Sequence, residues 1–206
     1  MTPLHNPVLF AKENKVDIQQ SNDTSWVIDV AKDGCVEVSF LQFDADLSVQ
    51  VNLNGQNAQC FLNCGYLSNK NNKININIKV MHNAKKTVSK QQVKGLATDF
   101  SDVCFYGQIV IPHNSQQCDG LQSHRGIVLS KNAVISATPQ LEIWADDVKC
   151  AHGSAVGPLP LDQIFYLQTR GLDVAVARKL LLSSFFGGIM PPDFEPVIQQ
   201  WMDENV

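Results

Sequence analysis

Short stretches of alternating apolar and polar residues fill most of this sequence and limit the folds open to it. From Thr24 to about Val156 they follow one another without a helical period. The plainest stretch is KININIKV, residues 73–80, in which every second residue is apolar. Turn formers such as Asn54-Gly55 and His113-Asn114 separate the stretches. The pattern predicts a mainly β protein of many short strands, arranged as a sandwich, a barrel or a solenoid.

The corners between the predicted strands favour a solenoid, although strand spacing alone does not choose among the three folds. Asparagine is abundant at these corners, where it tolerates left-handed backbone and hydrogen-bonds its own chain. Asn54-Gly55 is the one strong hairpin signal in the span. Most neighbouring strands are therefore not expected to pair as hairpins, which favours the stacked coils of a solenoid.

After Gly157 the apolar residues recur with helical spacing, which predicts three short helices. Pro160 suits the first position of the first helix, and Gly171 suits the residue that ends it. Asp173 is the expected N-cap of the second helix, and Asp193 that of the third. The side chains expected to face the interior are Val176, Ala177, Leu180, Leu181 and Ser184 or Phe185 on the second helix, and Phe194, Val197, Ile198, Trp201 and Met202 on the third.

These features divide the chain into three expected parts. Residues 1–23 are an N-terminal segment, expected to be poorly ordered up to about residue 22. Residues 24–157 are a β-helix core, and residues 158–206 are a C-terminal helical subdomain. A solenoid ends in strands whose backbone groups lack partners. We therefore expect the three helices to close the open end of the solenoid.

Composition and charge narrow the classes of function. Hydrophobic residues make up 44% and charged residues 17% of the 206 residues, which is enough for a sizeable core. The net charge of −4 argues against nucleic acid or an anionic membrane as the main partner. The first residues show no secretion signal, and no apolar run reaches the ~18 residues of a membrane span. The expected location is the cytoplasm, with no nucleic-acid or membrane partner.

The six cysteines are spread along the chain without the double pair of a zinc site. In a reducing cytoplasm we expect free thiols rather than a disulfide framework. Cys60 and Cys64 invite a metal interpretation, but no second pair follows, so packing in the core or in a turn is favoured. The sequence also shows no nucleophile elbow, phosphate loop or zinc-protease helix, which makes a hydrolytic enzyme a poor candidate.

The strongest candidate for chemistry lies in residues 140–157, QLEIWADDVKCAHGSAVG. Cys150 and His152 are two residues apart on a predicted strand, so their side chains leave it on one side, with roughly 6.6 Å between the two positions. Both side chains could therefore approach a single metal. Alone the pair is a weak signal, since a buried Cys beside a His at a strand end is the commoner case.

The stretch PQLEIWADDVKCAHGSAVG, followed shortly by QIFYLQTRGL, resembles the SufB/SufD family of iron–sulfur cluster assembly proteins. SufD proteins are the closer match, because they carry a nearly identical P-x-L-E-I-Y-A-D-D-V-K-C-S-H-G-A-T-V-G run and then F-Y-L-x-x-R-G. The resemblance extends from about residue 100 to residue 185. It implies a right-handed parallel β-helix with a small C-terminal helical part, in agreement with the solenoid pattern.

The resemblance also implies a function. SufD-like proteins are non-catalytic scaffold subunits that pair with a SufB-like subunit and a SufC-like ABC ATPase. No stably bound cofactor is implied, only a transient iron–sulfur cluster within the complex. Without the SufB-like subunit we expect a homodimer, formed through the residues that match the pairing strand of SufD: Leu141, Glu142, Ile143, Trp144 and Ala145.

Three residues are candidate cluster ligands on this resemblance. It implies that His152 lies at the interface with SufB and helps to hold the nascent cluster. Gln117-Cys118-Asp119 resembles instead the T-Q-C-D-S-L run of SufB, whose thiol is used in cluster assembly. For Cys118, coincidence and a cluster thiol both stay open. Cys150 is shared with the SufD run and is the alternative ligand, although a structural role is favoured for it.

Phe165, Tyr166, Arg170 and Gly171 match the F-Y-x-x-R-G signature, which implies a contact with the ATPase. Phe165 also suits a core position, and Arg170 suits the end of a helix dipole. The sequence departs from the family pattern in two places that bear on ATPase docking. Family members are much longer and begin with a helical domain that has no counterpart here. They also carry an acidic residue where this chain has FGGI, residues 186–189.

Two other classes of function stay open. One is a structural β-helix that pairs with other subunits but takes no part in cluster chemistry. The other is a carbohydrate-active enzyme on a β-helix, such as a polysaccharide lyase. That enzyme would need a secretion signal and a cleft of carboxylates, and the sequence shows neither.

Overall fold

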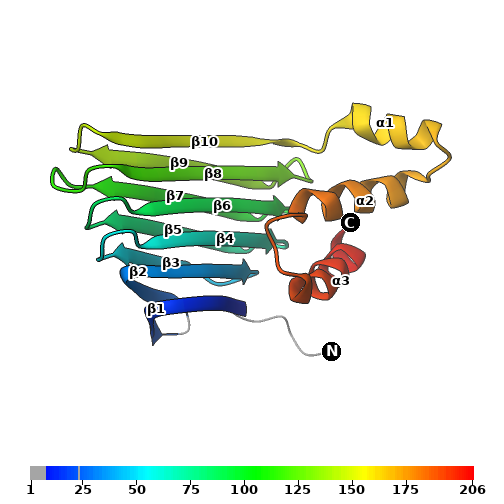
Figure 1. Ribbon diagram of the computed structural model, residues 1–206. Helices are drawn as coiled ribbons and strands as arrows, with labels where there is room; N and C mark the ends of the chain where they lie inside the picture. Colours follow the sequence, from blue (N-terminus) through cyan, green and yellow to red (C-terminus); the bar gives the residue numbers. More distant parts are fainter. Residues whose placement is uncertain (1–7, 23) are drawn as a thin grey trace.

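The computed structural model describes residues 8–22 and 24–206 and shows a parallel β-solenoid followed by helices (Figure 1). The fold class predicted from the alternating stretches is therefore confirmed. The strands are β1 (Val8–Asn22), β2 (Ser25–Gln42), β3 (Leu47–Leu53), β4 (Gln59–Ser68), β5 (Lys73–His82), β6 (Val88–Ala97), β7 (Asp102–Ile111), β8 (Cys118–Val128), β9 (Val134–Ile143) and β10 (Val148–Pro158). The helices are α1 (Leu161–Thr169), α2 (Val174–Phe186), the 3₁₀ turn η1 (Pro192–Phe194) and α3 (Glu195–Asn205).

The strands form two parallel walls joined through β2. The even-numbered strands are hydrogen-bonded in the order β10-β8-β6-β4-β2, and β3-β5-β7-β9 continue from β2 on its other half. Residues 25–30 of β2 pair with β3, and residues 35–42 pair with β4. The chain turns between these halves at Asp33, which has a φ of 57°. Each coil thus lays one strand on each wall, and the core lies between the walls.

The alternation along each strand fills this core as predicted. In β5, Ile74, Ile76 and Ile78 are buried, whereas Asn75 and Asn77 are exposed. Strands in register stack their buried side chains on one another and form one apolar cluster between the walls. Each buried side chain of this size contributes about 1.5–3 kcal/mol. The coils are therefore held together by stacked aliphatic residues as well as by backbone hydrogen bonds.

Asparagine acts at the corners differently from the prediction. Its side chains link successive coils: the amides of Asn52 and Asn54 donate to Asp29 Oδ1 over 2.9 and 2.8 Å, and Asn83 donates to Asn54 Oδ1 over 2.8 Å. Among the asparagines that the structure describes, Asn57 alone takes the expected left-handed backbone. The other non-glycine residues with positive φ in the described ranges are Lys15, Asp33, Lys70, Lys86, Asp99 and Gln117.

The expectation of a poorly ordered N-terminal segment is wrong for residues 8–22. They form β1, which runs antiparallel to both halves of β2. Val16 packs against the core cluster, and exposed Glu13 and Lys15 lie on the same strand. The register of β1 shifts near Val16 and again near Asn22. Residues 1–7, the rest of the segment expected to be poorly ordered, lie outside the described part of the chain.

Two of the four residues predicted at helix ends are confirmed in their roles, and two are not. Gly171, with a φ of 89°, follows α1, and Asp173 caps α2 by accepting a 2.8 Å hydrogen bond from the backbone N–H two residues on. Pro160 occupies the N-cap of α1 rather than its first turn. Asp193 does not cap α3; it lies in η1, and Phe194 holds the N-cap position. Among the described residues, none of the helices combines the length and apolar character needed to cross a bilayer.

The buried face of α2 differs from the prediction. Val176 and Leu180 are exposed, whereas Ala177, Leu182 and Phe186 are buried. The helix is apolar on more sides than the solenoid covers, so helical spacing alone did not identify the covered side. On α3 the expected stripe is confirmed, because Phe194, Ile198, Trp201 and Met202 are buried and Val197 packs against them.

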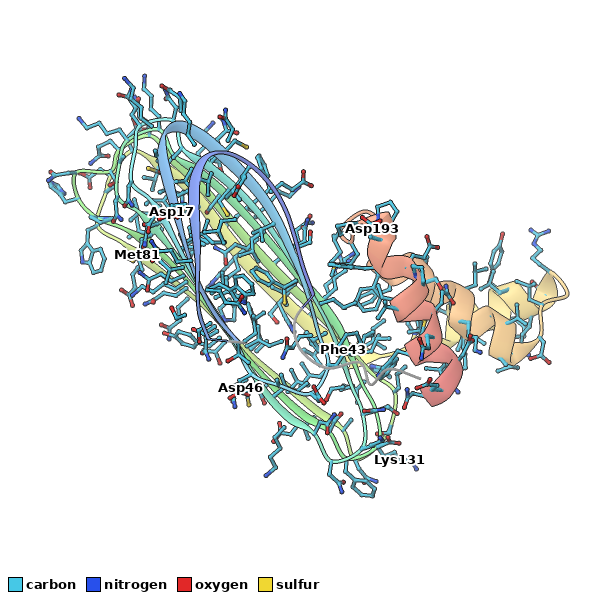
Figure 2. All side chains as sticks on the ribbon, turned by 90° about the horizontal axis from the view of Figure 1, so that it is seen from below. Asp17, Phe43, Asp46, Met81, Lys131 and Asp193 are labelled. Atoms are coloured by element: carbon cyan, nitrogen blue, oxygen red, sulfur yellow. The ribbon has the colours of Figure 1, made fainter. Side chains whose placement is uncertain are left out.

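The helices do not close the open end of the solenoid, which corrects the expectation. They pack beside the strand ends of the even-numbered wall, against one residue from each of four strands, Leu41, Leu67, Leu96 and Ile127. Phe43 belongs to the same cluster and lies between the solenoid and the helices (Figure 2). β9 and β10 lie at the end of the stack opposite β1 (Figure 1). We call this end, formed by β9 and β10, the open end.

Candidate functional site

The open end leaves two strand edges without partners. β9 pairs only with β7, and β10 only with β8, among the described residues. Their outer edges present rows of backbone N–H and C=O groups that another strand can pair with. The side chains of β9 and β10 are also less buried than those of the coils below, because nothing stacks on them. The open end is therefore both a backbone template and an uncovered section of the core.

His152 lies on the inner face of β10 and yet is exposed. It sits in register beside Gln122 of β8, whose side chain is buried in the interior. Neighbours in register share a face, so the imidazole leaves β10 on the side of the core rather than on the outer surface. Gln122 Nε2 donates to Gln91 Oε1 over 2.8 Å, which leaves Gln122 Oε1 without a partner among the described residues.

Cys150 is next to His152 on the same face and is half-buried. A Cβ added to Gly120, its neighbour in register, would lie 3.3 Å from Cys150 Sγ, so the glycine makes room for the thiol. Burial raises the pKa of the Cys150 thiol, and a hydrogen bond from the Gly120 backbone offsets part of that rise. The thiol is therefore neutral near pH 7 and would lose its proton on binding a metal.

Cys118 is not brought next to His152. It begins β8 and lies in register with Val148, four residues before His152, which is about 13 Å along the strand. Its sulfur is buried, 3.1 Å from Thr87 Oγ1, and carbonyl oxygens of Ala84 and Ser115 lie 3.3 and 3.2 Å away. The thiol hydrogen can be donated to either of these carbonyl oxygens. In the described ranges, no three His, Cys, Asp or Glu side chains gather around a common metal position.

The residues predicted to pair with another subunit all lie on the open end or just after it. Leu141 and Ile143 are half-buried on the inner face of β9, in register with buried Ile109 and Ile111. Trp144, directly after the strand, is 57% exposed. Of the remaining two, Glu142 accepts a hydrogen bond from the Gln108 amide, and Ala145 is buried.

A buried polar chain reaches the open end, and sequence analysis missed it. Tyr66 Oη lies 3.0 Å from His124 Nε2, and His124 Nδ1 lies 3.1 Å from Ser154 Oγ. Phe105 stacks on the His124 ring, with centroids 4.9 Å apart. Burial lowers the pKa of His124 to about 4, so the imidazole is neutral at neutral pH. The available signal was the run GLQSHRG, in which inward positions carry Gln122 and His124 instead of apolar residues.

A second buried imidazole, His82, belongs to the same polar interior. Its Nδ1 lies 2.7 Å from Thr87 Oγ1, and its Nε2 lies 2.9 Å from Ser89 Oγ. Burial lowers the pKa of His82 to about 4. Thr87 joins this imidazole to the Cys118 sulfur. With both nitrogens hydrogen-bonded, His82 ties the end of β5 to the start of β6 across the corner between the two walls.

Cys60 and Cys64 are core residues, as the favoured interpretation had it. Both are buried between the walls, and burial raises the pKa of each thiol to about 12. They are four residues apart on β4, which is about 13 Å along the strand. They cannot bind one metal ion together, and they stay protonated at neutral pH.

The residues matched to the ATPase signature lie on an uncovered helix surface. Phe165 and Tyr166 of α1 are 67% and 58% exposed, and the Arg170 guanidinium lies 5.3 Å from the centroid of the Tyr166 ring. Exposed Leu161 and Val174 border a groove of about 500 Å³ between α1, α2 and the ends of β8 and β10. Phe165 is therefore not a core residue, and this surface has the character of a contact site.

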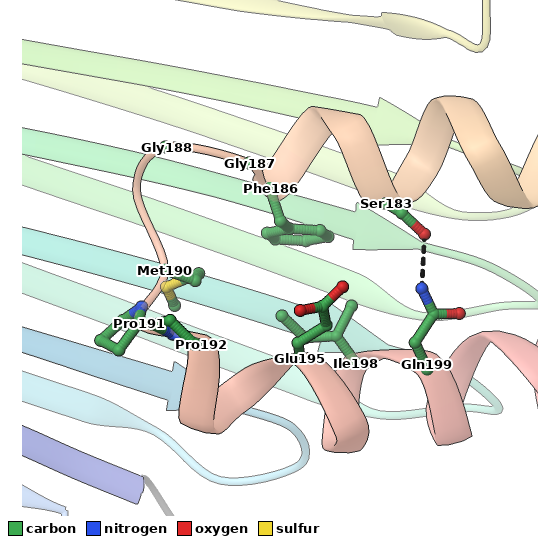
Figure 3. A pocket seen from close by; sticks show the side chains of 10 residues that line it. All are labelled: Ser183, Phe186, Gly187, Gly188, Met190, Pro191, Pro192, Glu195, Ile198 and Gln199. Atoms are coloured by element: carbon green, nitrogen blue, oxygen red, sulfur yellow. Dashed lines mark hydrogen bonds between the residues drawn. The ribbon is translucent and has the colours of Figure 1, made fainter.

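A smaller cavity of about 240 Å³ lies where α2 passes into α3 (Figure 3). Phe186, Met190 and Ile198 supply its apolar lining, and Glu195 is its one carboxylate. The chain passes this cavity through FGGI, residues 186–189, where the sequence departs from the SufD pattern. None of the candidate ligands or signature residues lines it, so the cavity is separate from both candidate sites.

Comparison with known proteins adds to this geometry. The family model described as the SUF system FeS cluster assembly, SufBD core domain, matches residues 12–185. The iron–sulfur cluster assembly protein SufD of Escherichia coli is 33% identical over 133 residues, which are 65% of this chain and 31% of that protein. A SufBD family protein of Synechocystis sp. is 37% identical over 102 residues, which are 50% of this chain and 22% of that protein.

A third relative comes from a plant. The chloroplastic protein ABCI7 of Arabidopsis thaliana is 43% identical over 81 residues, which are 39% of this chain and 17% of that protein. The matched segments span less than a third of the length of each of these three relatives.

Proposed function

This chain belongs to the SufB/SufD family, and from that premise we propose that it is a non-catalytic scaffold subunit of iron–sulfur cluster assembly. The observation that carries the proposal is the open end, where His152 is exposed on the inner face of a strand with a free edge. A scaffold must receive a cluster and pass it on. A ligand at an uncovered edge can be reached by a donor, a partner and an acceptor in turn.

The proposed partner at the open end is a SufB-like subunit. Free backbone groups on β9 and β10 support this, together with half-buried Leu141 and Ile143 and exposed Trp144. A second solenoid stacked here would pair the backbone groups and bury the apolar side chains. When the SufB-like subunit is absent, two copies of this chain pair in its place through a two-fold axis.

The cluster is cargo, and this chain supplies only part of its ligands. We assign His152 as one ligand and Cys150, on the same face, as the second, because imidazole and thiolate both bind iron. Cys118 is the weaker candidate, since it is buried and lies about 13 Å along the strand from His152. The partner subunit supplies the remaining ligands. A site shared between two chains also comes apart easily, as transfer of the cluster requires.

The proposed contact for a SufC-like ABC ATPase is the exposed surface of α1 and the groove beside it. Phe165, Tyr166 and Leu161 expose enough apolar area there to support a protein contact. This surface lies beside the walls and not on the open end. Both partners could therefore bind one chain together.

The test is anaerobic reconstitution of the complex with iron, sulfide, the SufB-like subunit and the ATPase. Absorption and Mössbauer spectra measure the cluster, and size-exclusion chromatography measures assembly. His152→Ala should lower the cluster yield while the complex still forms. Lys149→Ala, an exposed change on the other face of β10, should leave the yield unchanged. A normal yield in His152→Ala, with the complex intact, would remove the ligand role.

A pairing module without cluster chemistry is the second candidate function. The burial of Cys118 among carbonyl oxygens favours it, as does the lack of three assembled metal donors in the described residues. The same experiment separates the two functions. A wild-type complex that assembles but takes up no iron would support the pairing module against the scaffold.

A further inference from the structure

The buried chain of Tyr66, His124 and Ser154 runs from the middle of the core to the open end. Tyr66 belongs to β4, His124 to β8 and Ser154 to β10, so these side chains span four stacked strands of one wall, β4, β6, β8 and β10. Tyr66 and His124 are buried, and Ser154 is exposed. These hydrogen bonds therefore connect buried Tyr66 to exposed Ser154, which lies near His152.

Two glycines make this chain sterically feasible. Gly95 and Gly126 lie above Tyr66 in register. A Cβ at Gly95 would lie 2.1 Å from a carbon of the Tyr66 ring, and one at Gly126 would lie 3.0 Å from Tyr66 Oη. The phenol therefore stands along the axis of the solenoid in space that side chains on these strands would fill. Its hydroxyl is delivered to the level of His124, two strands above.

The position of each hydrogen follows from counting donors and acceptors. Burial raises the pKa of Tyr66, so the phenol keeps its hydrogen and needs an acceptor, and His124 Nε2 is its partner. An unsatisfied hydroxyl in the core would cost about 1–3 kcal/mol. Nε2 therefore accepts, and the neutral imidazole carries its hydrogen on Nδ1. That N–H donates to Ser154 Oγ, which leaves the Ser154 hydrogen free to point elsewhere.

Ser154 is well placed to use that hydrogen at the open end. It is two residues from His152 on the same face of β10, roughly 6.6 Å along the strand. Within residues 8–22 and 24–206, His124 is its one hydrogen-bond partner. We propose that Tyr66 and His124 are positioning residues that hold the Ser154 hydroxyl as a donor to an anionic sulfur, sulfide or thiolate, of the cluster bound at His152. This inference rests on the proposed function of His152.

A fixed donor beside the cluster has a measurable electronic effect. A hydrogen bond to a cluster sulfur stabilises the negative charge added on reduction and so raises the reduction potential. Without Tyr66 Oη, the imidazole is free to place its hydrogen on Nε2 and to accept from Ser154 through Nδ1. Ser154 would then donate its hydrogen to His124 Nδ1 and would present only acceptor lone pairs to the cluster. Changes at Tyr66 and at Ser154 should therefore move the potential in the same direction.

The first test needs only the purified protein, without its proposed partners. Nitrogen-15 NMR of the imidazoles reports which nitrogen of a neutral histidine carries the hydrogen. We expect the His124 signal, assigned by its loss in His124→Gln, to show the hydrogen on Nδ1. A hydrogen on Nε2 in the wild-type chain would overturn the proposal, whatever happens to the cluster.

The second test measures the potential of the cluster reconstituted with the SufB-like subunit. Ser154→Ala and Tyr66→Phe should each lower it by a tenfold change in the reduction equilibrium, about 59 mV for one electron. Ser154→Thr keeps the hydroxyl at an exposed site and should keep the wild-type potential. If Ser154→Ala matches the wild-type potential in a loaded complex, this inference fails and the proposed function stands. If the wild-type complex takes up no cluster, both fail.

Discussion

His152 of β10 lies in register beside Gln122 of β8, and only one of the two is buried. The pair marks the last coil of the solenoid. The same inward position is buried in β8 and exposed to solvent in β10. Within the described part of the chain, Gln122 Oε1 is buried and has no hydrogen-bond partner. This relationship is the physical reason for placing cluster chemistry at the open end.

The isolated chain should self-associate through the open end. We expect sedimentation to show a dimer at micromolar concentration, because pairing buries Leu141 and Ile143 and the free strand edges. Leu141→Lys should give a monomer, since the charge would have to be buried at the contact. Ser136→Lys, on the outer face of the same strand, should stay dimeric. A wild-type chain that sediments only as a monomer would contradict the contact.

The α1 surface should be needed for ATPase binding but not for folding. Tyr166→Ala and Arg170→Ala should each weaken binding about tenfold, which is about 1.4 kcal/mol. Both residues are exposed, so the unfolding free energy should stay within about 0.5 kcal/mol of the wild type. Gln200→Ala on α3 is the control. Isothermal titration with the purified ATPase measures the effect, and unchanged affinity in both variants would exclude this surface.

Gly95 should be intolerant of even a methyl group. In Gly95→Ala the new Cβ would collide with the Tyr66 ring, and overpacking of this kind costs about 1–3 kcal/mol. Gly153→Ala on β10 meets no atom within 4 Å and should leave the stability unchanged. Urea unfolding measures both. In a Tyr66→Ala background the cost of Gly95→Ala should shrink, and an undiminished cost would mean that Tyr66 is not the obstacle.

Stability should fall between pH 7 and pH 4.5 because of His82 and His124. Burial lowers the pKa of both from 6.5 to about 4. As pH falls through this window, the unfolded chain takes up protons before the folded one, so stability present above pH ~6.5 is lost. The expected loss at pH 4.5 is roughly 2 kcal/mol for each histidine.

Urea unfolding at the two pH values checks this expectation. His124→Gln removes one of the two titrating groups, so its unfolding free energy should depend less on pH than that of the wild type. Equal unfolding free energies for the wild type at pH 7 and pH 4.5 would show that the two histidines are not held neutral by the fold.

The solenoid was predictable wherever the core is aliphatic, as in β5. It was harder to see in β6, whose inward positions carry Ser89 and Gln91 rather than apolar residues. These polar side chains are accepted in the core because His82 and Gln122 on neighbouring strands hydrogen-bond them. Gln122 is 31 residues from Gln91 in the sequence and His82 lies on the preceding strand, so neither partner leaves a periodic signal within β6 itself.

The same limit applies to β1 and to the candidate site. β1 forms because it pairs antiparallel with β2, and the sequence pattern of residues 8–22 alone does not predict that pairing. Cys150 and His152 could be placed on one strand face because the strand period is local. The distance of Cys118 from His152 depends on the register between β8 and β10, and the link from Tyr66 to Ser154 depends on the stacking of four strands, β4, β6, β8 and β10. Neither follows from a single stretch of sequence.

β1 also determines how far self-association can go. Its register shifts near Val16 and Asn22, together with exposed Glu13 and Lys15, are features that natural edge strands use to resist further pairing. On the proposed pairing, the molecule has one end that accepts another solenoid and one end that resists it. In the language of polymers it is a monovalent unit. Two copies paired in the proposed way, or one copy and a partner, would each use up their single pairing end, so growth would stop at two and would not propagate into a fibre.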